Sequence, residues 1–148
     1  MNFSENNNFQ KKITFLTISI GVVFFYFGIL KFFPNLSPAE EIGCSTVCKL
    51  SFGLLPPKLC LYLLATLEVG IGVCLMIRTM LRPIIIIAIA HLVMTFSPLF
   101  LSPELVFQDS LISPTLLGQY IYKNVIIICA LLVVFPDKEQ EVVLEVAR

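Results

Sequence analysis

Charged residues are scarce in this chain, and the two signs are equal in number. Only 14% of its 148 residues are charged and 57% are hydrophobic, whereas a soluble domain carries about a quarter charged residues. The mean hydropathy of +0.93 also argues against an ordinary soluble domain. Ten basic and ten acidic side chains give a net charge of zero. This balance argues against nucleic acid as a partner, because proteins that bind it carry basic patches.

Several sequence signatures of nucleotide and metal binding are also missing. The chain has no glycine-rich phosphate loop, which argues against a nucleotide-driven pump within it. Its single histidine, His91, has no Cys, His or carboxylate at the spacing that places several metal ligands on adjacent helical turns. We therefore predict no metal site.

The cysteines lack the C-x-x-C redox motif. Cys44, Cys48 and Cys60 lie in or beside the first long connection between apolar runs, and the first two are spaced as C-x3-C. On the outer side of a membrane, where disulfides persist, this spacing could close a small loop. Three alternatives stay open: free thiols, a structural disulfide between Cys44 and Cys48, and redox work.

Four long apolar runs account for most of the chain, at residues 13–33, 59–77, 83–101 and 116–135. Each is about as long as the roughly 20 residues that a helix needs to span a bilayer. The first run is too long for a secretory signal and lacks an A-x-A-like cleavage site. We predict an all-α protein, an integral membrane four-helix bundle forming one domain over 13–135. Short tails occupy 1–12 and 136–148, and the Asn-rich residues 1–8 are expected to be disordered.

The orientation follows from the basic residues outside the runs. Two lie on one side of the predicted bundle, Lys49 and Lys58. Six lie on the other side: Lys11, Lys12, Arg78, Arg82, Lys138 and Arg148. Because cytoplasmic loops carry the excess of Lys and Arg, we predict that both termini are cytoplasmic.

Each apolar run contains one ionisable side chain well inside it: Lys31, Glu68, His91 and Lys123. Such a residue costs roughly 2.5–3.5 kcal/mol at the bilayer centre, so it usually faces the bundle interior and marks a ligand or proton path. At 1.5 Å per residue, Lys31, Glu68 and Lys123 can converge in the outer half of the bundle. We predict that Glu68 pairs with Lys123 or with Lys31. The alternatives are that Lys31 extends to the interface and that the pair only fixes the helix arrangement.

Polar residues near these charges extend the candidate site. Gln119 and Asn124 flank Lys123, and Thr95 lies one turn after His91. His91 is either a hydrogen-bonded packing residue or a functional one. In the functional alternative it relays protons or forms a hydrogen bond with a quinone carbonyl. Pro98 removes a backbone hydrogen bond, so we expect a kink that opens space beside Thr95.

Small residues mark the helix faces that carry Lys31 and Glu68. Gly21 and Gly28 lie on one stripe with Lys31, and Gly72 lies one turn after Glu68. Small residues allow membrane helices to approach closely. We therefore expect the first two helices to pack along these faces.

Taken together, these motifs resemble the DoxX-like superfamily of small four-helix membrane proteins, and within it the YkgB/RclC branch. The similar segments, covering about residues 18–134, are Gly28-Ile29-Leu30-Lys31-Phe32-Phe33-Pro34, Leu67-Glu68-Val69-Gly70-Ile71-Gly72, Arg82, and Gly118-Gln119-Tyr120-Ile121-Tyr122-Lys123-Asn124. The family's G-x-x-K-F element falls on Gly28, Lys31 and Phe32. Its second-helix Glu falls on Glu68, and its fourth-helix polar element on Lys123 and Asn124. The chain departs from the branch in a shorter first outer loop and in Asn124, where Asp is common.

The resemblance implies a bacterial inner-membrane protein associated with oxidative stress or thiol homeostasis. DoxD relatives form membrane subunits of a thiosulfate:quinone oxidoreductase. We therefore expect a redox-linked membrane subunit, not an enzyme on its own, whose polar pocket binds quinone or a small anion. Its expected partners are the bilayer and a redox protein or further copies of itself. The alternatives are a non-enzymatic scaffold or assembly protein and a small-solute or proton transporter.

Overall fold

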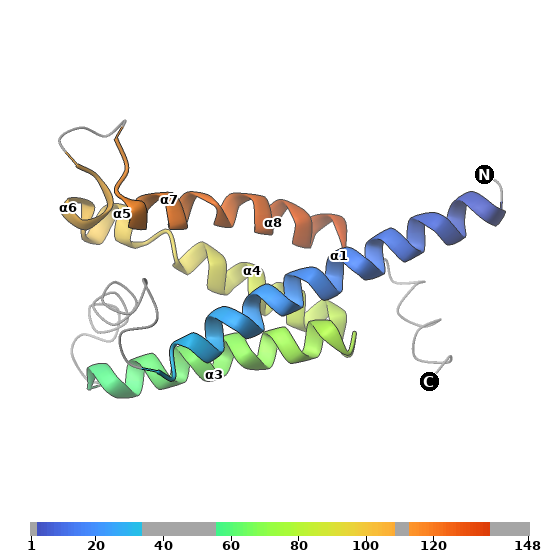
Figure 1. Cartoon of the computed structure of the whole chain (residues 1–148), viewed down its shortest axis with the longest axis horizontal. Coiled ribbons are helices and arrows are strands. Elements are labelled where there is room, and N and C mark those ends of the chain that lie inside the picture. Colours follow the sequence, from blue (N-terminus) through green and yellow to red (C-terminus); the bar gives the residue numbers. More distant parts are fainter. Residues whose placement is uncertain (1–2, 34–55, 109–112, 137–148) are drawn as a thin grey trace.

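The computed structural model describes residues 3–33, 56–108 and 113–136, and within these ranges the chain is helical with no strand longer than a single bridge pair. Figure 1 shows the arrangement. The helices are α1 (Phe3–Leu30), α3 (Pro57–Met76), α4 (Leu81–Met94), α5 (Pro98–Leu101), α6 (Pro103–Val106), α7 (Leu116–Tyr122) and α8 (Asn124–Val133). The predicted all-α class is therefore confirmed for the part of the chain described.

Four segments in these ranges are long and apolar enough to cross a membrane. They are Asn8–Leu30, Lys58–Met76, Leu81–Leu101 and Leu116–Val133. The third combines α4 with α5, and the fourth combines α7 with α8. These segments match the four predicted runs to within a few residues at each end.

The start of the first helix differs from the prediction. We expected a disordered stretch over residues 1–8, but among the described residues α1 is already helical at Phe3. Once a helix is nucleated, each added residue gains a backbone hydrogen bond, so a polar segment can extend an apolar one. As a result, the first part of α1 projects past the ends of the other helices (Figure 1).

Both later spans are interrupted next to polar residues. Helix α4 ends at Met94, and three residues separate it from α5, which begins at Pro98. Pro98 lacks the backbone N–H that would continue the hydrogen bonds of the helix. The expected interruption next to Pro98 is therefore confirmed. In the fourth span the irregular residue is Lys123, whose carbonyl oxygen accepts from the N–H of Ile126 at 3.1 Å. This i to i+3 bond locally tightens the helix.

Helices α1 and α3 lie side by side because glycines remove the side chains between them (Figure 1). A Cβ added at Gly72 would lie 2.7 Å from the carbonyl oxygen of Gly21, and one at Gly28 would lie 2.8 Å from the backbone nitrogen of Val69. Only hydrogen fits at these positions. The predicted packing of the small-residue faces is confirmed.

The main core joins all four spans. Its buried residues are Ile20, Phe24, Ile71, Leu75, Leu81, Ile85, Ala88, Leu92, Leu131 and Val134. Large apolar side chains also cover the outside of the bundle, including Phe15 and Ile126, which are more than 70% exposed. An outer surface of this kind is compatible with contact with a lipid bilayer.

We predict that Gly72→Ala destabilises the bundle, whereas Gly70→Ala does not. The added methyl group at Gly72 meets backbone atoms of α1, and no atom lies within 4 Å of a Cβ at Gly70. Overpacking of this kind costs about 1–3 kcal/mol, so thermal unfolding in detergent should begin at a lower temperature for Gly72→Ala only. Equal unfolding temperatures for the two variants would contradict the close approach of α1 and α3.

Candidate functional site

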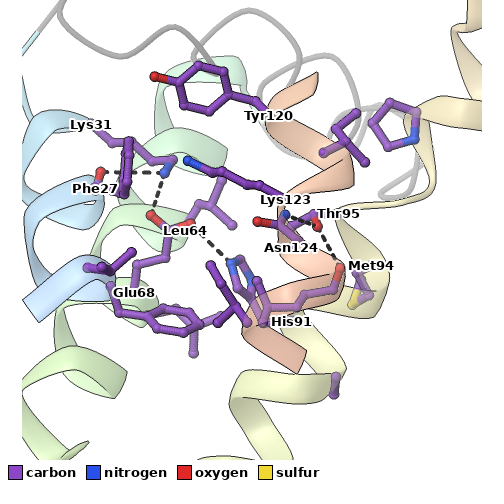
Figure 2. Close-up of a pocket in the computed structure, with 18 of the residues that line it drawn as sticks. Phe27, Lys31, Leu64, Glu68, His91, Met94, Thr95, Tyr120, Lys123 and Asn124 are labelled. Atoms are coloured by element: carbon purple, nitrogen blue, oxygen red, sulfur yellow. Dashed lines mark hydrogen bonds and ion pairs between the residues drawn. The ribbon is translucent and has the colours of Figure 1, made fainter. Parts of the chain in front are cut away.

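A cavity of about 430 Å³ lies among the four spans. Most of its wall is apolar, and polar side chains from all four spans line the rest, as Figure 2 shows. These polar lining residues are Lys31, Glu68, His91, Thr95, Tyr120, Lys123 and Asn124. The cavity thus brings together six of the seven residues predicted to bind a ligand or relay a proton.

Glu68 on α3 is held by two partners from two other helices. Its Oε2 accepts from the ammonium group of Lys31 on α1, and its Oε1 lies 3.0 Å from Nε2 of His91 on α4. All three residues are buried, with 8% or less of their surface exposed. An ion pair between Glu68 and Lys31, one of the two predicted pairings, is therefore present (Figure 2).

This arrangement explains how a carboxylate can occupy the interior. A buried charge is tolerated when it is paired and hydrogen-bonded, and here both carboxylate oxygens have a partner. Lys31 also donates to the backbone oxygen of Phe27 at 3.4 Å. Lys31 thus points inward and binds the buried carboxylate of Glu68. The alternative in which Lys31 extends to the membrane interface is wrong.

Lys123 does not pair with Glu68, contrary to the other predicted pairing. Its ammonium nitrogen lies 4.1 Å from the ring centroid of Phe27 and 4.0 Å from that of Tyr120. Contacts of this kind stabilise a cation through the electron-rich faces of the rings. Because Lys31 and His91 already occupy both oxygens of Glu68, Lys123 is left with aromatic neighbours.

The cavity is lined by more basic than acidic side chains. The amine ends of Lys31 and Lys123 point toward each other in Figure 2, and the charge of Lys31 acts on Lys123. Glu68 is the one acidic residue that lines the cavity. Two ammonium groups and one carboxylate leave one positive charge when all three are ionised and His91 is neutral.

Thr95 and Asn124 form a second polar contact on the opposite side of the cavity. The Nδ2 of Asn124 donates to the hydroxyl oxygen of Thr95 at 2.8 Å, and this hydroxyl donates to the backbone oxygen of Leu92 at 2.6 Å. The contact joins the start of α8 to the break that follows α4. The space expected beside Thr95 is part of the cavity.

Gln119 is the exception among the predicted residues. It is exposed on α7 and does not line the cavity. Leu117, Tyr120, Ile121 and Asn124 line it instead, at the i, i+3, i+4 and i+7 spacing of one helix face. Gln119 lies on the other side of that helix, so the expectation that it donates a hydrogen bond in the pocket is wrong.

The sequence did not reveal the contact between His91 and Glu68 or the position of Phe27 beside Lys123. We considered His91 alone, although it lies near the middle of its span, as Glu68 does. Phe27 lies one turn before Lys31, and helical spacing of four residues places it on the same face. That spacing was the available signal for an aromatic residue beside the charges.

Cys44 and Cys48 lie outside the described residues, whereas Cys60 is buried in the first turn of α3. Within ranges 3–33, 56–108 and 113–136, no group of three or more His, Cys, Asp or Glu side chains gathers in a way that could hold a metal ion.

Comparison with known proteins adds no relative. The chain matches no family model, no curated protein and no solved structure. The DoxX-like resemblance thus stays a prediction carried by the short motifs quoted above.

We predict that Lys31→Met destabilises the bundle more than the double substitution Lys31→Met/Glu68→Met. Removing one partner of a buried ion pair costs up to about 3–5 kcal/mol because the other charge stays buried, whereas replacing both with apolar groups is often neutral. Unfolding in mixed detergent micelles measures the difference.

Lys123→Met is the matched control for this prediction. Lys123 has no carboxylate partner among the described residues, so its loss should cost about 1 kcal/mol or less. If Lys123→Met were as destabilising as Lys31→Met, the assignment of Lys31 as the structural partner of Glu68 would be wrong.

Proposed function

We propose that this chain is a quinone-binding subunit of a redox-linked complex in the bacterial inner membrane, as its DoxX-like motifs imply, with both termini cytoplasmic, as the distribution of its Lys and Arg residues implies. The observation that carries the proposal is the mainly apolar cavity with its small group of polar side chains. Ligand sites of this kind are mostly apolar, with few polar groups that fix orientation. A quinone combines an apolar tail with a ring whose oxygens need hydrogen-bond donors.

The size and position of the cavity support a lipophilic ligand. Its volume of about 430 Å³ falls within the roughly 300–1,000 Å³ of small-molecule sites. Leu67 on α3 and Ile87 on α4 line it and are 40% and 43% exposed. A ligand dissolved in the lipid can therefore reach the cavity between these two helices.

The charges of the cavity support an electron-rich head group. Lys123 has no carboxylate partner among the described residues, so its N–H groups can donate to a quinone carbonyl oxygen. The excess of basic side chains favours the same end of such a ligand. A small anion is less well supported, because the mostly apolar wall offers few donors to replace the water that a bare anion loses.

The chain's part in this proposal is to bind and orient the quinone. We assign the electron-carrying group to a partner protein, by analogy with the quinone oxidoreductase in which DoxD relatives of the family are the membrane subunits. The second candidate is a scaffold, which the Lys31–Glu68–His91 cluster favours because it ties three helices together. A scaffold needs this cluster but has no need of a cavity or of Lys123.

We predict that wild-type protein, purified from membranes, retains a quinone that a Glu68→Gln/Lys123→Gln variant loses. The substitutions remove the carboxylate that orders the cavity wall and the ammonium group that donates to the ligand. Mass spectrometry of co-purifying lipids, normalised to the membrane extract, measures the retained quinone. Gln119→Ala is the matched control and should retain it, because Gln119 lies outside the cavity.

Identical lipid profiles for the wild type and the folded double variant, with nothing enriched over the extract, would contradict the quinone proposal. The scaffold would then be the better reading. A defined anion retained by the wild type in place of quinone would keep the site and change its ligand.

A further inference from the structure

The orientation of the Asn124 amide is set by the hydroxyl group of Thr95. A hydroxyl has a single hydrogen to donate, and Thr95 uses it on the backbone oxygen of Leu92 at 2.6 Å. The 2.8 Å contact between Thr95 and Asn124 must therefore be a hydrogen bond donated by the amide nitrogen of Asn124. The nitrogen end of the amide therefore faces Thr95, as the surrounding hydrogen bonds require.

The carbonyl oxygen of Asn124 is consequently turned away from Thr95. Figure 2 shows this oxygen on the side of the amide that faces His91 and Glu68 across the cavity. Within the part of the chain that the structure describes, no hydrogen bond to this oxygen occurs. The cavity thus presents a hydrogen-bond acceptor to whatever occupies it.

The two ends of the polar wall make different demands on a ligand. The ammonium group of Lys123 donates hydrogen bonds, so its partner can be either a carbonyl or a hydroxyl oxygen of the ligand. The carbonyl oxygen of Asn124 accepts, so a ligand oxygen beside it must carry its own hydrogen. A quinone carbonyl there would place two oxygens with lone pairs against each other, whereas a hydroxyl would donate.

We infer that the cavity binds the hydroquinone form of its ligand, a diphenol with an apolar tail, more tightly than the quinone form, and that Asn124 sets this preference. The inference rests on the proposed quinone site. Asn124 contacts the ligand hydroxyl, and Thr95 is a positioning residue that keeps the amide oxygen available. A site built to hydrogen-bond a ligand hydroxyl disfavours an analogue without it, because its own polar group is left unpaired.

The experiment compares decylubiquinol and decylubiquinone by calorimetric titration of the full-length protein in detergent, without oxygen so that the quinol stays reduced. One net hydrogen bond corresponds to roughly two- to tenfold in affinity, so the wild type should bind the quinol tighter by that factor. Asn124→Leu should bring the ratio of the two affinities to about one, because Leu offers no acceptor to the quinol hydroxyl and no oxygen that opposes the quinone carbonyl. Gln119→Ala should keep the wild-type ratio, because Gln119 lies outside the cavity.

Thr95→Val and Thr95→Ser separate orientation from contact. Without the hydroxyl, the amide of Asn124 can turn its NH2 group to a quinone carbonyl, so Thr95→Val should bring the ratio of the two affinities to about one. Thr95→Ser keeps the hydroxyl and should restore the preference. If Thr95→Val fails to fold, Asn124→Leu still tests the preference.

The outcomes distinguish the two proposals. Equal affinities in the wild type, or tighter binding of the quinone, would overturn the inference and leave the quinone site in place. Binding of neither form would overturn the proposed function itself. A wild-type ratio retained by folded Asn124→Leu would show that another group sets the preference, and this result also overturns the inference.

Discussion

The arrangement of the bundle depends on one carboxylate that is buried in an apolar interior. Glu68 lies in the middle of an apolar helix, and each of its two oxygens contacts a residue from a different neighbouring helix, Lys31 and His91. A buried carboxylate without such partners would be strongly unfavourable. The cluster therefore fixes both the depth and the rotation of α1 and α4 relative to α3, which nonspecific apolar packing among lipid-like side chains does not do.

The glycines make this ion pair geometrically accessible. Gly28 lies one turn before Lys31, and a side chain there would collide with Val69, next to Glu68. The absence of that side chain brings the two backbones close enough for Lys31 to bind Glu68 while it remains buried. Close packing and charge pairing are thus one constraint, since a wider separation of α1 and α3 would leave the carboxylate with His91 alone.

The sequence predicted the four spans and the ionisable residues of the site better than it predicted which of these residues form an ion pair. Apolar run length is enough to locate four spans, and the cost of charge in lipid is enough to select Lys31, Glu68, His91 and Lys123. Depth along a helix, however, does not determine which way a side chain faces, so Lys31 and Lys123 remained equivalent partners for Glu68. The rotation of each helix comes from packing that involves all four spans. Gln119 was misplaced for this reason, although the spacing of Tyr120 and Asn124 indicated the inward face.

The polar residues of the cavity have different roles, which follow from the hydrogen-bond partners that each already has within the protein. Lys31, Glu68 and His91 satisfy one another, so they hold the helices and leave little hydrogen-bonding capacity for a ligand. Lys123 and Asn124 lie where the fourth span is irregular, and Thr95 lies where α4 breaks before Pro98. The Lys31–Glu68–His91 cluster therefore holds the helices around the cavity, whereas Lys123 and the amide oxygen of Asn124 are left to contact what enters it.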